Sequence, residues 1–230
     1  MSDRFQIILA ATPTFQQMHG SFSVIEFDGF DASKTSVTLV HSLGKKAVCY
    51  IDAGTWENWR PDAKSFPKSV LGAPDAGWPG ERWLDIRQLK ILLPIMKKRI
   101  AMCASKGFDA IDPDNVNGVE NHSGFHLTQA DQLTYDRAIA ALAHADNLSV
   151  ALKSYAGAAS QLEKNFDFVV EEQCVSYSEC SSFSSFISDL KPVFDIEYVN
   201  KLTFCPSLPT GVFGVAKRLS LNGWTLRCPN

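Results

Sequence analysis

The sequence lacks the features that mark several large classes of protein. It contains no run of Lys and Arg residues, and its formal net charge is only −3, so a polyanionic partner such as nucleic acid is not expected. No apolar run approaches the ~20 residues of a membrane-spanning helix. A glycine-rich dinucleotide fingerprint and a phosphate-binding loop are both missing, which argues against the open nucleotide-binding folds. We therefore expect no nucleic-acid partner, no membrane contact and no cofactor.

The common nucleophile and metal motifs are missing as well. No serine nucleophile elbow and no Cys–His pairing is present. The cysteines include no CxxC spacing and have no His partner, which argues against zinc. The segment DPDNVNG resembles a calcium loop only loosely, because Val116 stands at the fifth position, where an oxygen ligand belongs. We therefore predict no metal site.

The 6 cysteines are an even number, which is compatible with three disulfides. Cys174 and Cys180 share the polar segment CVSYSEC and are predicted to pair first, with Cys205 and Cys228 as the second pair. The remaining two, at positions 49 and 103, lie inside apolar stretches and are compatible with either free buried thiols or a third disulfide. The N-terminus is a poor signal peptide, with one basic residue and a very short apolar run. The cysteines nevertheless favour an extracellular protein whose leader is absent from this sequence.

Short apolar runs alternate with helical patterns along the chain. Strands are predicted at 5–11, 22–27, 47–51, 108–112, 148–152, 166–170, 192–198 and 212–216, and helices at 33–43, 86–105, 128–146 and 181–190. A capping box from Thr128 to Asp131 marks the start of the clearest helix. Strands that alternate with helices imply a parallel sheet with right-handed crossovers. Eight strands within 230 residues favour one (β/α)8 barrel that spans residues 1–230.

Ionisable residues stand at nearly every predicted strand end. In a barrel these ends form the active face. They supply Asp28, Asp52, Asp112 with Asp114, Lys153, Glu171 with Glu172, and Asp195 with Glu197. In the segment FDAIDPDNVN, strand alternation would place Asp112 and Asp114 on the same face. The sequence therefore predicts a cleft lined by carboxylates.

Carboxylates without His or Cys suit three functions: acid/base cleavage of a glycosidic bond, metal-dependent hydrolysis, and binding of a cationic ligand. Residues 53–85 favour a sugar ligand. They are predicted to form a long loop with four tryptophans, Trp56, Trp59, Trp78 and Trp83, and aromatic faces stack on sugar rings and attract cations. A loop of this length in a compact domain is usually functional.

Several long segments, in order and at similar spacing over residues 47–198, resemble glycoside hydrolase family 114, the endo-α-1,4-polygalactosaminidase-like proteins. They are VCYIDAGTWENWRPD, WPGERWLDI, GFDAIDPDNVNG, GFHLT, VVEEQCVSYSEC and KPVFDIEY. The resemblance implies a (β/α)8 barrel that cleaves α-1,4-linked galactosamine polymers. It also implies a disulfide between the two cysteines of EQCVSYSEC, which would anchor the loop that follows strand six.

The family pattern implies a catalytic Asp at the end of strand four and a catalytic Glu at the end of strand six. Asp114 is favoured for the first because it directly precedes Asn115, with Asp112 as the close alternative. Glu172 fits the second motif better than Glu171. The chain departs from the family pattern in its first strand and at Asn117, Val119 and Ser154, three positions expected near the sugar.

We therefore predict a secreted, monomeric, endo-acting glycosidase that cleaves a cationic amino-sugar polymer. The Asp would act as nucleophile or base and Glu172 as general acid, with retention of configuration. Predicted substrate contacts are Asp52, Trp56, Asn115, Lys153, Tyr155, Glu171 and Glu197. The alternatives are a carbohydrate-binding barrel without catalytic activity and a metal-dependent hydrolase.

Overall fold

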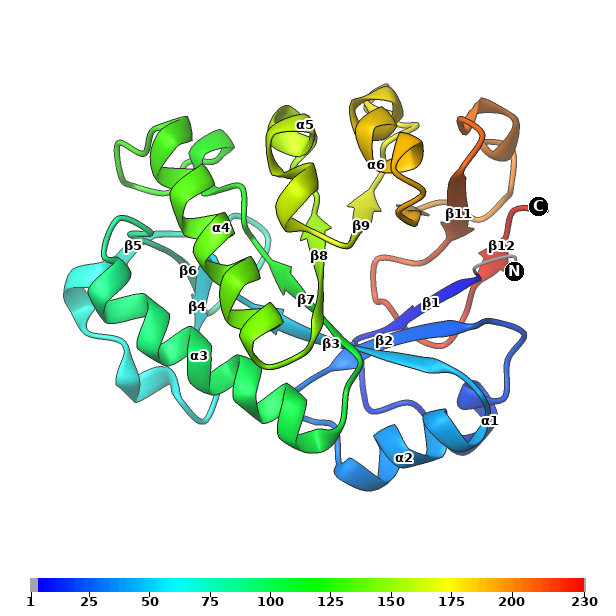
Figure 1. Ribbon diagram of the computed structural model, residues 1–230, viewed down its shortest axis with the longest axis horizontal. Helices are drawn as coiled ribbons and strands as arrows, with labels where there is room; N and C mark the ends of the chain where they lie inside the picture. Colours follow the sequence, from blue (N-terminus) through cyan, green and yellow to red (C-terminus); the bar gives the residue numbers. More distant parts are fainter. Residues whose placement is uncertain (1–3, 230) are drawn as a thin grey trace.

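The computed structural model describes residues 4–229 and forms a (β/α)8 barrel (Figure 1). The parallel strands follow one another around the barrel in chain order. They are β1 (Phe5–Ile8), β2 (Val24–Asp28), β3 (Lys46–Asp52), β7 (Ala110–Asp114), β8 (Ser149–Lys153), β9 (Phe168–Glu172), β10 (Val193–Glu197) and β11 (Val212–Ala216). The short strand β12 (Leu226–Arg227) pairs antiparallel with β11. All eight predicted strands are present, which confirms the predicted fold class.

Hydrophobic side chains fill the barrel interior on the N-terminal side of the strand ends. Phe5 and Phe194 stack with ring centroids 4.6 Å apart, and Ile7, Val48 and Val170 belong to the same buried cluster. Interior side chains from strands far apart in sequence thus meet along the barrel axis. The polar residues at the C-terminal ends of the strands therefore lie above a packed hydrophobic layer inside the barrel.

The seam between the first and last parallel strands is closed by hydrogen bonds. The Leu9 amide donates to the Leu221 carbonyl over 2.9 Å. The buried Lys217 ammonium donates to Gln6 Oε1 over 3.1 Å and to the Ile7 carbonyl over 2.6 Å. These bonds hold the segment after β11 against β1, which places residues 219–221 beside the C-terminal ends of the strands.

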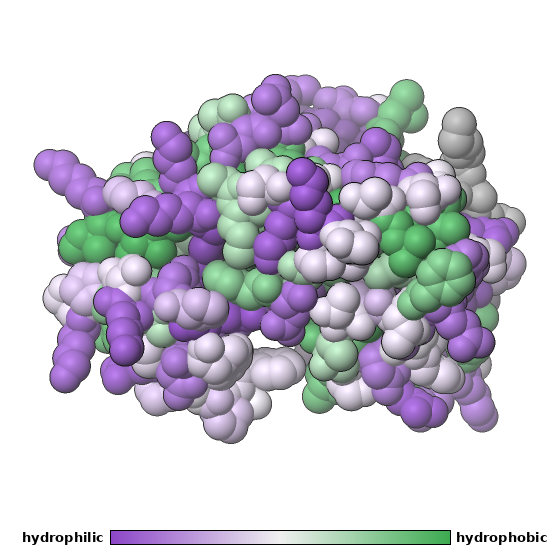
Figure 2. Space-filling view, turned by 90° about the horizontal axis from the view of Figure 1, so that it is seen from below, coloured by the Kyte–Doolittle hydropathy of each residue, from purple (hydrophilic) through white to green (hydrophobic). Residues whose placement is uncertain are grey.

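Helices cover the outside of the barrel. They are α1 (Phe15–Met18), α2 (Lys34–Ser42), α3 (Leu89–Lys106), α4 (Gln129–Ala145), α5 (Ala159–Leu162) and α6 (Ser184–Ser188). The predicted capping box is present, because Thr128 Oγ1 accepts from the Asp131 amide and Asp131 accepts from the Thr128 amide. The face shown in Figure 2 is largely hydrophilic, with its hydrophobic side chains in separate patches. No helix within residues 4–229 has the length and apolar composition needed to cross a membrane.

The region predicted to be a long loop contains a small sheet. Strands β4 (Thr55–Glu57), β5 (Leu71–Pro74) and β6 (Glu81–Leu84) pair antiparallel in the order β4-β6-β5. The prediction of an irregular loop was wrong because these strands are only three or four residues long and are flanked by prolines and glycines. The sheet gives the tryptophan-rich segment a rigid frame beside the barrel.

Three disulfides are present among the described residues. Cys174–Cys180 and Cys205–Cys228 confirm the two predicted pairs. Cys49 and Cys103, for which the sequence left a free thiol and a disulfide open, form a third disulfide with a Cα–Cα distance of 6.0 Å. Both lie in apolar surroundings because the outer face of β3 packs against the inner face of α3. This bridge ties α3 directly to the sheet.

Candidate active site

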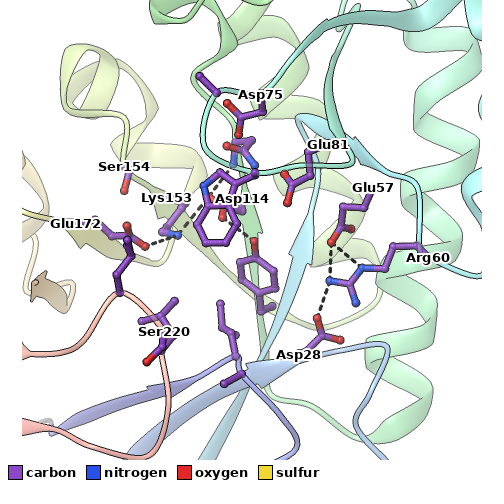
Figure 3. A pocket seen from close by; sticks show the side chains of 18 of the residues that line it. Asp28, Glu57, Arg60, Asp75, Glu81, Asp114, Lys153, Ser154, Glu172 and Ser220 are labelled. Carbon is purple, nitrogen blue, oxygen red and sulfur yellow. Dashed lines mark hydrogen bonds and ion pairs between the residues drawn. The ribbon is translucent and has the colours of Figure 1, made fainter.

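A pocket of about 540 Å³ opens at the C-terminal ends of the parallel strands. Its wall is formed by the ends of β2, β3, β7, β8 and β9, by the β4–β6 sheet, and by residues 219–221. Figure 3 shows the side chains that converge there. The position agrees with the general placement of active sites in parallel barrels.

Lys153 joins the two carboxylates at the centre of the pocket. Its ammonium lies 3.2 Å from Asp114 Oδ1 and 3.1 Å from Glu172 Oε1 (Figure 3). The Lys153 side chain is only 3% exposed, whereas the Asp114 and Glu172 side chains retain 22% and 27% exposure. The ammonium is thus buried between two acids that both face the open pocket.

The electrostatic surroundings keep Asp114 ionised. Burial alone would raise the pKa of Asp114, but the Lys153 ammonium and the hydrogen bonds from Tyr50 and the Asn115 amide outweigh it and lower that pKa. The Tyr50 hydroxyl donates to Asp114 Oδ2 over 2.7 Å, and the Asn115 amide donates to Oδ1 over 2.8 Å. Burial would lower the pKa of Lys153, but its carboxylate neighbours, led by Asp114, raise it well above normal. The two side chains therefore hold each other in their charged forms.

The backbone after β7 is shaped to present Asp114. Asn115 adopts a left-handed conformation with φ of 60°, and its side-chain amide donates to Asp52 Oδ2 over 2.7 Å. A Cβ atom on Gly54 would lie 1.7 Å from the Asn115 carbonyl oxygen, so only glycine fits beside this turn. The backbone of Gly54, after β3, thus packs directly against the backbone of Asn115, after β7.

The opposite wall of the pocket is rich in carboxylates. Arg60 neutralises two of them, with contacts of 2.6 Å to Asp28 and 2.7 Å to Glu57. Asp75 and Glu81 form no ion pair with any residue in the described part of the chain. Burial raises the pKa of Glu81 to about 7, a hydrogen bond from Thr55 opposes this shift, and the Glu57 carboxylate adds to it. Asp75 and Glu81 thus stand in this wall without a cationic partner among the described residues.

Four of the predicted site residues line the pocket: Asp114, Asn115, Lys153 and Glu172. Asp112 does not. It lies one layer deeper, is 0% exposed, and lies near the equally buried Glu26, with no hydrogen-bond partner for its carboxylate among the described residues. Burial raises the pKa of Asp112 to about 7. Asp112, the alternative candidate for the catalytic Asp, therefore lies below the pocket, whereas Asp114 lines it.

Two other predicted contacts hold loops in place. Asp52 is 1% exposed and accepts hydrogen bonds from the Thr55 amide and hydroxyl, both over 2.6 Å. Glu197, also 1% exposed, accepts from the amides of Val175 and Ser176 in the loop after β9. Neither residue lines the pocket, and each carboxylate is engaged by backbone amides and side chains of a neighbouring loop.

Glu171, Tyr155 and Trp56 also lie away from the pocket. Glu171 alternates with Glu172 on β9, so it faces the helices and not the barrel interior. Tyr155 is 1% exposed within the main hydrophobic core. The Trp56 indole donates to the Ala63 carbonyl over 3.0 Å, which turns it inward. Strand-end position alone was therefore insufficient to identify pocket residues.

Several pocket residues were missed by sequence reasoning. They include Tyr50, Glu57, Asp75, Glu81 and Tyr198, together with residues 219–221. Strand alternation backwards from Asp52 could have indicated Tyr50, since it shares the inward face of β3. The residues from the β4–β6 sheet carried no comparable signal. Two of the positions that depart from the family pattern, Asn117 and Ser154, do line the pocket.

Comparisons with known proteins agree on one group. The sequence model of glycoside-hydrolase family GH114 matches residues 1–230. The crystal structure of Ega3 from Aspergillus fumigatus in complex with galactosamine is 33% identical, with a TM-score of 0.92, and the match covers 98% of this chain and 95% of that one. The glycoside hydrolase domain of PelA from Pseudomonas aeruginosa has the same fold, with 12% identity, a TM-score of 0.76 and 98% coverage of both chains. The search of curated proteins finds no match.

Proposed function

Since this chain belongs to glycoside hydrolase family 114 and is a glycosidase, we propose that it cleaves α-1,4 linkages inside galactosamine-containing polysaccharides. The observation that carries the proposal is the pairing of Asp114 and Glu172 through one buried ammonium at the pocket centre. We assign Asp114 as the nucleophile and Glu172 as the general acid and base.

The separation of the two acids supports a retaining mechanism. One nitrogen lies 3.2 Å from Asp114 Oδ1 and 3.1 Å from Glu172 Oε1, so these two oxygens are at most about 6.3 Å apart. Carboxyl groups of retaining glycosidases are ~5–5.5 Å apart, and those of inverting enzymes are ~6.5–9.5 Å apart to admit a water molecule. The upper limit of about 6.3 Å for these two oxygens lies below the separation of inverting enzymes and includes that of retaining enzymes.

The reaction then has two displacement steps. The Asp114 carboxylate attacks the anomeric carbon and forms an ester, while Glu172 gives its proton to the leaving glycosidic oxygen as that bond breaks. In the second step Glu172 takes a proton from water, the water oxygen attacks the same carbon, and the bond to Asp114 breaks. Because Lys153 and Tyr50 stabilise the ionised form of Asp114, the nucleophile is charged before substrate arrives.

The charge of the pocket supports an amino-sugar substrate. Asp75 and Glu81 face the pocket without a cationic partner in the described residues, and an ammonium group on the sugar would supply one. The related Ega3 structure holds galactosamine. We propose a polymer with free amino groups as the preferred substrate.

We further propose that the protein acts outside the cell as a monomer. Three disulfides among the described residues suit an oxidising compartment. All the side chains assigned here to catalysis come from a single chain, so the site needs no second copy.

The test is digestion of galactosaminogalactan, both deacetylated and acetylated, with mass spectrometry of the products. Wild-type protein should release oligosaccharides of several sizes from the deacetylated polymer, and Glu172→Gln should release none while keeping its thermal transition. Glu179→Gln changes a carboxylate in the loop that follows β9 and does not line the pocket, and this variant should remain active. Near-normal hydrolysis by Glu172→Gln would remove Glu172 from the acid role. If the wild-type protein binds the polymer without releasing products, the result would support a carbohydrate-binding barrel. If a chelator abolishes activity, the result would support a metal-dependent hydrolase.

A further inference from the structure

Two tryptophans stand exposed at the rim of the pocket. Trp59 is 52% exposed and Trp78 is 51% exposed, and both line the pocket. Large aromatic side chains are normally buried, so exposed rings beside a pocket call for an explanation by binding. Trp83, from the same tryptophan-rich segment, is 4% exposed and packs beneath the rim.

The Trp59 ring is held in place from one side. A Cβ atom on Gly80 would lie 2.8 Å from Trp59 Cζ3, so the ring rests directly on the Gly80 backbone, whose φ is 100°. The Asn58 amide donates to the Gly80 carbonyl over 3.1 Å and fixes the two segments against each other. The ring is thus packed against Gly80 at one edge, and it retains 52% exposure while lining the pocket.

The same contact brings Trp78 and two carboxylates near Trp59. Trp78 stands two residues before Gly80 in the turn between β5 and β6, with Asp75 in the same turn and Glu81 directly after it. Asp75 and Glu81 form no ion pair in the described part of the chain. Figure 3 shows Glu81 and Glu172 on opposite sides of Asp114. The rim therefore combines aromatic faces with unpaired negative charge, away from the general acid.

We propose that Trp59 and Trp78 form a distal subsite that binds a further amino-sugar unit of the polymer, beyond the linkage that is cleaved. This inference rests on the proposed function and deepens it. The ring faces stack on the pyranose, and the sugar ammonium lies between the aromatic faces and the Asp75 and Glu81 carboxylates. Substrate length then determines affinity, because only a chain that reaches the rim gains these contacts.

The test compares long and short substrates. In the Trp59→Ala/Trp78→Ala variant, KM for the deacetylated polymer should rise about tenfold, whereas kcat should stay within about threefold. For the shortest oligomer that wild type cleaves, both constants should be unchanged. Trp59→Phe/Trp78→Phe should restore most of the polymer affinity. Phe15→Ala, which removes an aromatic side chain of 62% exposure outside the pocket, is the matched control and should behave as wild type.

A binding measurement separates this inference from the catalytic proposal. In the Glu172→Gln background, calorimetric titration with a long deacetylated oligomer should show about tenfold weaker binding when both tryptophans are replaced. Failure of the catalytic proposal would appear as residual hydrolysis by Glu172→Gln itself. Equal KM for the polymer, or equal affinity for the oligomer, with and without the tryptophans would overturn the distal subsite. An equal rise in KM for short and long substrates would also overturn it.

Discussion

Replacement of Lys153 by Met tests the electrostatic core of the site. Lys153 is 3% exposed and is the cation in contact with both Asp114 and Glu172. Met has a similar length and no charge, so the substitution leaves two carboxylates facing each other without their counter-ion. Breaking a buried ion pair from one side typically costs about 3–5 kcal/mol. The Asp114 and Glu172 side chains are 22% and 27% exposed, so water recovers part of that loss, and we expect about 2–3 kcal/mol at pH 7.

The loss should depend on pH in a defined direction. The folded state lowers the pKa of Asp114 and raises that of Lys153. The stabilisation from Asp114 is present above its unfolded pKa of ~3.9 and disappears as pH falls through its lower folded value. The contribution of Lys153 is present below ~10.4 and disappears only at higher pH. The difference between wild type and Lys153→Met should therefore be largest from about pH 5 to 9 and should decrease as pH falls below ~3.9 and through the lower folded pKa of Asp114.

Urea unfolding of both proteins at pH 3, 5, 7 and 9 measures this difference. Lys106→Met is the matched control, because the Lys106 ammonium donates to the Gly29 and Phe30 carbonyls and forms no carboxylate ion pair in the described structure. The loss of unfolding free energy in Lys106→Met should be similar at all four pH values. Activity of Lys153→Met should fall at least a hundredfold at pH 7, because the nucleophile loses its stabilising charge. An equal loss of stability at pH 3 and pH 7 would refute the ion-pair reasoning.

Three further outcomes follow from the structure. Burial raises the pKa of Asp195 to about 7, whereas the pKa in the unfolded state is ~3.9, so the free energy of unfolding falls as pH rises between these two values. In Asp195→Asn this fall should be smaller by about 2 kcal/mol between pH 5 and 8, as measured by urea titrations. The disulfide between Cys49 and Cys103 closes a sequence separation of 54, and replacing both cysteines by Ala should cost about 4 kcal/mol of unfolding free energy by the same method. NMR of the first products should show the α-anomer before mutarotation, and a β-anomer would contradict the retaining assignment of Asp114.

The barrel and the general position of its site could be predicted from local sequence patterns. Each strand is a short apolar run with a clear polar end, and Asp114, Lys153 and Glu172 stand at three such ends. Parallel topology then brings these ends to one rim without any knowledge of the packing. The convergence of the strand ends thus follows from periodicity and connection rules, whereas the choice of Asp114 and Glu172 among their acids came from the family resemblance.

Pairing between distant residues was harder to foresee. The apolar neighbours of Cys49 and Cys103 correctly indicated burial, but burial is compatible with either a free thiol or a disulfide. The choice depends on which turn of α3 packs against which residue of β3, and sequence periodicity does not fix that register. The same limit applies to the β4–β6 sheet, whose strands are too short to show alternation and whose pairing places Glu81 in the pocket.

Depth within the barrel decides between Asp112 and Asp114, and depth is a property of the whole fold. The two residues share the inward face of β7, as alternation predicts, and differ by two positions along the strand, about 6.6 Å. Whether the lower position reaches water depends on how far side chains of the other strands fill the interior. Here Lys153 from β8 and Tyr50 from β3 donate to Asp114, which lines the pocket, whereas Asp112 is fully buried near Glu26. The choice of Asp114 as the proposed nucleophile thus depends on residues from other strands, although its own strand makes both candidates available.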